Sequence, residues 1–172
     1  MKRIFVICLA ALLCMTMFSA CASGENGSSG SAVQDELVEG TKLSDIVDKI
    51  DQEIGIAMAG EVTQEMLSDM YGIDDTMAED FYGKYAQVMP GVDDVVIVKA
   101  KEGKIEDVKA ALEKRKEARI AEQYLPDMIS KAEAGKVVTK GDYAALLIVG
   151  DTTKDISEEI DKAEEIFLSF FA

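Results

Sequence analysis

An uncharged run of 17 residues that ends at a cysteine is the feature that most limits what this chain can fold into. Residues 1–3 form a short cationic head, residues 4–20 carry no charge, and two small residues stand immediately before Cys21. A positive head, an apolar segment and a small-residue cleavage site are typical of a secretory signal peptide. We therefore expect residues 1–20 to be removed and the rest of the chain to fold outside the cytoplasm.

The residues around the cleavage site indicate a lipid anchor. Phe18-Ser19-Ala20-Cys21 has the order of a lipoprotein signal, with Phe18 where Leu is usual. We expect Cys21 to carry lipid and to hold the protein on the outer face of the cytoplasmic membrane. Two alternatives stay open: an uncleaved anchor, since 17 residues lie at the lower limit for spanning a bilayer, or simple secretion. All three export the remaining chain.

Cysteine and histidine content excludes several kinds of site. Cys8 and Cys14 lie within the signal, and Cys21 would carry lipid, so the exported domain has no free thiol for a disulfide or a metal. The chain has no His, which excludes a Ser-His-Asp or Cys-His enzyme and a histidine zinc site. We predict a protein that is not an enzyme and that needs no cofactor or metal.

The charge of the exported part narrows its partners. Lys2 and Arg3 are two of the 18 basic residues, and all 33 acidic residues lie beyond residue 20, so the exported chain carries a net charge of −17. Such a surface repels nucleic acid and anionic lipid headgroups. We expect no nucleic-acid partner, and contact with the membrane only through the lipid on Cys21.

Composition divides the exported chain into a tether and one domain. Residues 21–40 are rich in Gly, Ser and acidic residues, and residues 23–31 contain nothing apolar. Such a segment is expected to behave as a flexible leash with a reach of about 25 Å. Apolar periodicity begins at Leu43, so we expect residues 41–172 to form a single domain.

Hydrophobic spacing predicts alternating helices and strand pairs. A first helix is expected from Leu43 to about Gly60, capped by Thr41 or Ser44, and Thr63 and Gly72 bound a second one. The remaining expected elements are a helical turn at 76–81, strands at 82–89, 95–98, 137–139 and 143–149, and helices at 103–123, 126–135 and from 153 onward.

This order predicts an α+β fold. Two hairpins, about four strands in all, would form a small antiparallel sheet packed with three or more helices. Residues 95–98 are apolar at every position, so this strand should be buried on both of its faces. We expect helices to cover one face of the sheet.

Several short motifs resemble a known family. They are the Phe18–Cys21 lipobox, Tyr71-Gly72-Ile73-Asp74, residues 94–101 with Arg115 farther on, Tyr124-Leu125-Pro126, and Gly141-Asp142-Tyr143 before an apolar strand. With them the chain resembles an uncharacterised family of small lipoproteins from Gram-positive anaerobic bacteria, classed as a domain of unknown function. The resemblance covers most of residues 41–150. It implies an exported α+β domain and supplies no functional residues.

Arg115 and Arg119 are the first candidate ligand-binding residues. They lie one helical turn apart and continue the apolar line of Ile105, Val108 and Leu112. A guanidinium group there is suited to holding a carboxylate or phosphate. The alternative is that the arginine stems cover the edge of the core or pair with an acidic residue. We favour a structural pair for Arg115 with an acid from one of the turns.

Other polar groups give less specific signals. Asp74-Asp75 with Glu79-Asp80, and Asp93-Asp94, are acid clusters suited to Ca²⁺ ligation in principle, but none has the spacing of an EF-hand loop. We expect them to be solvated turns and caps. Tyr124 is a further ligand-binding candidate, and the alternative places it at the edge of the core.

Three functions remain open at this point. We favour a lipid-anchored, non-catalytic module that binds a protein or another component of the cell envelope. The alternatives are a small-ligand or cation-binding lipoprotein and a hydrolase that works without His.

Overall fold

Strand β3 (Asp94–Ala100) lies at the centre of the fold, because residues 95–98 are fully buried on both faces as expected. The computed structural model describes residues 35–172. The expected signal peptide (residues 1–20), Cys21 and the first part of the expected tether lie outside the described residues. The other strands are β1 (Ala59–Glu61), β2 (Ala78–Ala86), β4 (Lys136–Lys140) and β5 (Tyr143–Ile148).

All neighbouring strands pair antiparallel in the order β1-β2-β3-β5-β4. The expected hairpin around Lys140-Gly141 is confirmed, since Lys140 pairs with Tyr143. The α+β class is also confirmed, but the described residues form five strands where we expected about four. The additional strand, β1, occupies the place where we expected the end of the first helix.

Residues 35–172 form five helices, and local signals explain where two of them begin. The helices are α1 (Leu43–Glu53), α2 (Gln64–Tyr71), α3 (Ile105–Ala121), α4 (Pro126–Ala134) and α5 (Ile156–Ser169). Thr63 caps α2 by accepting from the Met66 N–H, and Gly72 ends it in the left-handed conformation that suits glycine. Pro126 stands in the first turn of α4, where its missing N–H costs nothing.

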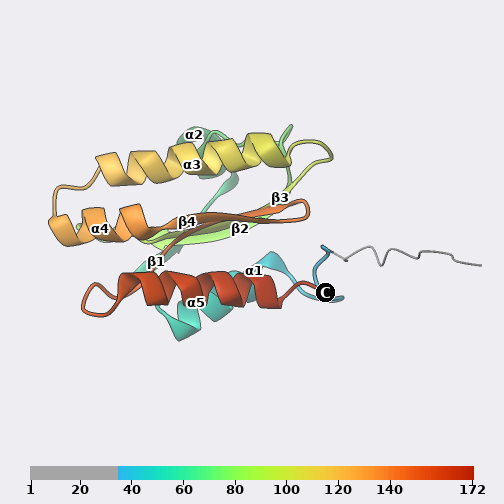
Figure 1. Cartoon of the computed structure of the whole chain (residues 1–172). Helices are drawn as coiled ribbons and strands as arrows, with labels where there is room; N and C mark the ends of the chain where they lie inside the picture. The colour runs from blue at the N-terminus through green and yellow to red at the C-terminus, as the bar shows by residue number, and fades with distance from the viewer. Residues whose placement is uncertain (1–34) are drawn as a thin grey trace, which may run out of the picture. The chain divides into compact units, whose positions relative to one another are not determined.

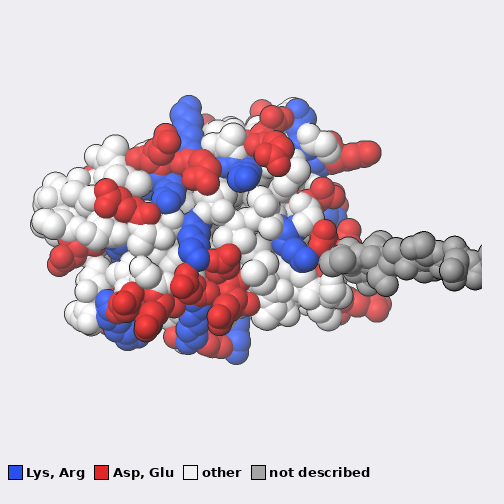
Figure 2. All heavy atoms as spheres, viewed as in Figure 1, with Lys and Arg blue, Asp and Glu red and all other residues white. Residues whose placement is uncertain are grey.

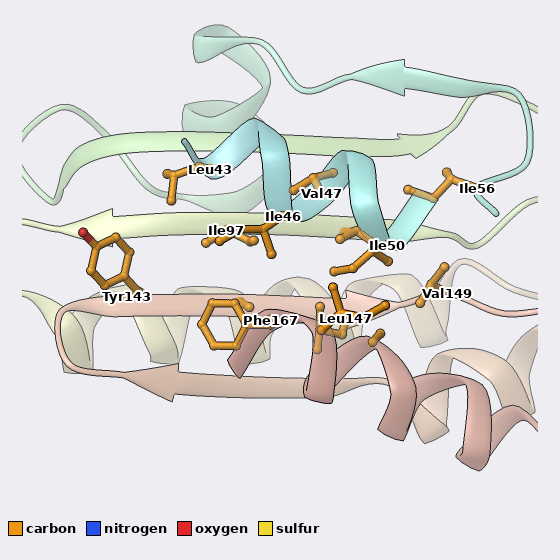
Figure 3. Packing of buried hydrophobic residues seen from close by; sticks show 14 residues of the cluster. Leu43, Ile46, Val47, Ile50, Ile56, Ile97, Tyr143, Leu147, Val149 and Phe167 are labelled. Atoms are coloured by element: carbon orange, nitrogen blue, oxygen red, sulfur yellow. The ribbon is translucent and has the colours of Figure 1, made fainter. Parts of the chain in front are cut away.

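Helices cover both faces of the sheet, which corrects our expectation of one covered face. Figure 1 shows α2 and α3 on one side of the strands, α1 and α5 on the other, and α4 at one end of the sheet. Alternate residues of β3 and β5 divide between two hydrophobic clusters, one on each side. Figure 3 shows the α1–α5 side, where Ile46, Ile50 and Phe167 pack over Ile97 and Leu147.

Three element boundaries also differ from expectation. The N-cap of α1 is Lys42, whose backbone N–H donates to Asp45, rather than Thr41 or Ser44. Helix α1 ends at Glu53, well before Gly60. Strand β2 begins at Ala78, so most of the expected helical turn at residues 76–81 is extended instead.

Two opposite ends of the sheet matter for function. The loop end is formed by the connections α1–β1 (residues 54–58), β2–β3 (87–93), α3–α4 (122–125) and β5–α5 (149–155). The tether end carries Leu37, which pairs with Phe171, and Asp35, which forms an ion pair with Lys140.

Residues 35–40 therefore pack on the domain, although we placed them in the tether. Their backbone is fixed by the Val38 N–H donating to the Phe170 carbonyl. Within residues 35–172, no helix has the length and apolar character needed to cross a membrane.

Candidate functional site

A buried polar cluster lies beneath the loop end, between the sheet and α3. Asp94, the first residue of β3, is fully buried. It accepts a hydrogen bond of 2.5 Å from the Tyr71 hydroxyl and one of 2.9 Å from Arg115 Nε. Arg119 Nε lies 3.6 Å from the same carboxylate, so two guanidinium groups face one acidic side chain.

The two arginines reach Asp94 because they occupy core-facing positions of α3. Val108 and Leu112 begin the buried stripe of this helix, and Arg115 and Arg119 continue it. The Arg115 side chain is only 3% exposed and its guanidinium lies 4.8 Å from the centre of the Tyr71 ring. The cluster therefore replaces a section of hydrophobic core.

Burial governs the ionisation of this cluster. Loss of hydration raises the pKa of Asp94, while the charge of Arg115, the Tyr71 hydrogen bond and the charge of Arg119 act in the opposite direction. Burial also raises the pKa of Tyr71 well above its usual range, and the charge of Asp94 adds to this effect. Tyr71 therefore stays protonated and donates a hydrogen bond to Asp94.

Arg119 also ties the cluster to the loop end. Its Nη2 donates to the Gly91 carbonyl at 2.9 Å, and its Nη1 lies 2.7 Å from Glu122. Gly91 follows Pro90 in the β2–β3 connection, and a Cβ atom at Gly91 would lie 2.4 Å from the Val88 carbonyl oxygen. Only glycine fits this close turn, and the arginine holds it against α3.

Asp93 makes a second buried ion pair next to the first. Its Oδ1 lies against the ammonium group of Lys131 from α4, and its Oδ2 accepts from the Ala57 N–H at 3.2 Å. Both side chains are almost completely buried. Asp93 and Asp94 are therefore not solvated turn residues, which corrects our expectation for this acid pair.

A pocket of about 360 Å³ opens above the Asp93–Lys131 pair. It is lined by residues 54–57, 90–93 and 150–152 of three connections, together with Met128 and Lys131 of α4. Hydrogen bonds from the Thr153 backbone and side chain lower the pKa of Asp151 on this pocket, and the charge of Lys131 contributes to the same shift. The pocket thus combines apolar walls with both signs of charge.

Large apolar side chains are exposed on the same end. Met58, Met89 and Tyr124 are 70%, 83% and 69% exposed. Met58 also has a positive φ of 46°, a conformation that side chains other than glycine rarely adopt. In Figure 2 the surface over the α3–α4 connection carries few charged side chains, unlike most of the visible face.

The structure brings together two of the three ligand-binding candidates named from the sequence. Arg115 and Arg119 meet at Asp94 and bind groups of the chain itself. Arg115 also lines a cavity of about 260 Å³ between α2 and α3. Its side chain is almost completely buried, so little of the guanidinium group is accessible from that cavity. Tyr124 stands apart at the loop end, and Cys21 lies outside the described residues.

Sequence reasoning missed Lys131 and Tyr71. Lys131 lies one turn after Met128 on the inner side of α4. Its place on a partly apolar helix face could have indicated from the sequence that this lysine is buried. Tyr71 gave no signal, because its partner Asp94 comes from a distant strand. The expected acid clusters at Asp74 and Glu79 are exposed, and within residues 35–172 no group of acidic side chains is arranged to hold a metal ion.

Comparison with known proteins identifies a family for this region. The profile of DUF4358, a domain of unknown function, matches residues 52–149, which is more than half of the chain. No curated protein and no solved structure matches the chain. The match confirms the expected resemblance to a family of unknown function; lipid attachment and a Gram-positive source stay predictions.

Proposed function

The chain belongs to the DUF4358 family, and from its geometry we propose that it is a lipid-anchored, extracytoplasmic binding module without catalytic activity. Its binding surface is the loop end, and its partner is a protein of the cell envelope. The observation that carries this proposal is the pocket over Asp93 and Lys131, on the end that also exposes Met58 and Met89. Apolar side chains exposed beside a pocket with a few polar groups are a common form of recognition surface.

The position of the tether supports this function. Residues 35–40 pack on the domain at the end of the sheet opposite the connections that line the pocket (Figure 1). A lipid on Cys21 would hold that opposite end nearer the membrane and leave the loop end accessible to partners. The acidic surface also keeps the domain away from the membrane, because anionic headgroups repel it.

The contacts of Asp93 favour binding over hydrolysis. A two-carboxylate hydrolase needs an acid and a base that are free to exchange protons with a substrate. Asp93 and Asp151 both line the pocket, but Asp93 is held by Lys131 and the Ala57 N–H. Asp151 accepts from the Thr153 N–H and hydroxyl. Neither carboxylate has the environment of a general acid.

The anchor is tested by replacing Cys21 with Ala. Diacylglyceryl attachment supplies the two chains that stable anchoring requires, so Cys21→Ala should lose label from a radioactive fatty acid and leave the membrane fraction or accumulate as a precursor. Cys14→Ala is the matched control and should behave as wild type. Equal label on the wild type and Cys21→Ala would contradict the anchor.

The binding surface is tested by photo-cross-linking in cells that produce the full-length protein. A photoreactive residue at Met89, on the loop end, should give a discrete cross-linked species. The same residue at Met70, which is 41% exposed on α2, is the control and should not give that species. Identical products from both positions, or none from Met89, would overturn the assignment of the loop end.

A further inference from the structure

Lys131 has more hydrogen-bonding capacity than the chain itself uses. An ammonium group has three N–H donors, and among residues 35–172 the one acceptor that pairs with Lys131 Nζ is Asp93 Oδ1. The Lys131 side chain is 6% exposed, so bulk water hydrates it poorly, and it lines the pocket at the loop end. A buried ammonium in this position favours a ligand that brings an acceptor oxygen, above all a carboxylate.

The remaining charges disfavour a simple anion. Asp93 and Asp151 also line the pocket, so its three ionised side chains sum to one negative charge. Asp151 is exposed at the pocket rim, where Oδ1 accepts from Thr153. Its second oxygen is suited to an ammonium group. A ligand with only negative charge is repelled by the two carboxylates, and a ligand with only positive charge is repelled by Lys131.

The pocket also has an apolar wall of suitable size. Ile54, Ile56 and Met128 contribute hydrocarbon surface, and the fully buried Val92 lies behind them. The volume of about 360 Å³ lies at the lower end of the range for small-molecule sites. The wall is therefore able to accept an aliphatic group, but not a large ring system with its own polar groups.

We propose that this pocket binds a small zwitterion with an aliphatic portion, the chemistry of a free apolar amino acid. Its carboxylate contacts Lys131, its ammonium group contacts Asp151, and its aliphatic portion lies against Ile56 and Met128. This inference rests on the binding function proposed above and adds a ligand class to the same end of the molecule.

The test uses four matched probes on the full-length protein in detergent micelles. L-leucine carries both charges, N-acetyl-leucine only the carboxylate, leucinamide only the ammonium, and N-acetyl-leucinamide neither. Carbon-13 labels on the methionine methyl groups report binding, because Met128 lines the pocket and Met70 on α2 does not. L-leucine should shift the Met128 signal in a saturable manner and leave Met70 unchanged, and the three other probes should bind at least about tenfold more weakly.

Two variants locate the charges. Lys131→Met should weaken L-leucine binding by about tenfold or more and leave the affinity for leucinamide nearly unchanged. Because Lys131→Met also leaves Asp93 without its partner, Asp151→Asn provides a second variant at an exposed position. It should weaken the binding of L-leucine and leave the affinity for N-acetyl-leucine unchanged. Lys114→Met, exposed on α3, is the control.

The outcomes separate this inference from the proposed function. Equal binding of L-leucine and N-acetyl-leucinamide, no Met128 shift with any probe, or unchanged affinity in Asp151→Asn would overturn the zwitterion. Each of these results leaves the cross-link at Met89 as an independent measure of whether the loop end binds a partner.

Discussion

Replacing Arg115 with Met tests whether the Asp94 cluster holds the fold together. Methionine has a similar unbranched stem and fills most of the same space, so the main change is loss of the guanidinium. Removing one partner of a buried ion pair costs about 3–5 kcal/mol, because the other charge stays buried. Asp94 is fully buried but keeps the Tyr71 hydroxyl and Arg119 at 3.6 Å. We therefore expect a loss at the lower end, about 3 kcal/mol.

The assay is thermal and urea unfolding of Arg115→Met beside the wild type. For a domain of this size, a loss of about 3 kcal/mol lowers the melting temperature by roughly 10 °C. Lys114→Met is the matched control: it is the neighbouring residue on α3, it is exposed, and it should change the unfolding free energy by less than about 0.5 kcal/mol.

A double-mutant cycle separates charge from packing. In Asp94→Asn the side chain is neutral and needs no cation beside it. Adding Arg115→Met to this variant should therefore lower the unfolding free energy by less than it does in the wild type. Additive effects would mean that packing alone explains the loss. An Arg115→Met variant as stable as the wild type would refute the structural pair altogether.

Two further predictions concern Tyr71 and Thr63. The pKa of Tyr71 is raised in the folded state. Its hydroxyl therefore contributes fully to the unfolding free energy below the ordinary tyrosine pKa of 10.0. Above that pH the contribution falls, because the unfolded chain loses the proton first. The gap in unfolding free energy between the wild type and Tyr71→Phe should therefore narrow above about pH 10 in urea titrations, and a constant gap would contradict the buried hydrogen bond. Thr63→Ala removes the cap on the Met66 N–H and should cost about 1 kcal/mol by the same assay, whereas Thr63→Ser should cost little.

Elements with strong local signals were predictable from the sequence. The cap at Thr63, the left-handed Gly72 and the first-turn Pro126 each act within one helical turn, so a short window contains the full cause. The apolar run at residues 95–98 similarly predicts burial on two faces, and the structure confirms it. Such features need no knowledge of distant residues.

Strand β1 was missed because its cause is not local. It contains three residues, too few to show alternation, and it exists because Gly60 pairs with Tyr85 of β2. The sequence pattern predicts a helix end at Gly60, since glycine is common there. In the structure Gly60 is a strand residue instead, and a Cβ atom there would require only the exposed Gln87 side chain to move.

The acid pair Asp93-Asp94 was misinterpreted for a related reason. Two acids after Pro90-Gly91 have the composition of a solvated turn. Their burial depends on Arg115 and Lys131, which lie farther along the chain on two different helices. The predictable part was the unusual place of Arg115 and Arg119 on an apolar stripe. The unpredictable part was which acid would meet them.

The consecutive positions of Asp93 and Asp94 connect the two halves of the candidate site. Asp94 is fixed by Arg115 and Tyr71, and its neighbour Asp93 forms the floor of the pocket with Lys131. The Gly91 carbonyl, two residues earlier, is held by Arg119. The β2–β3 connection and the first residue of β3 are therefore bound to α3 and α4 at three nearby points, and a wall held in this way is already organised before a ligand arrives. The arginines named as ligand candidates thus act on the pocket indirectly, by fixing the loop that carries Asp93, while Lys131 is the cation that the pocket presents to a ligand.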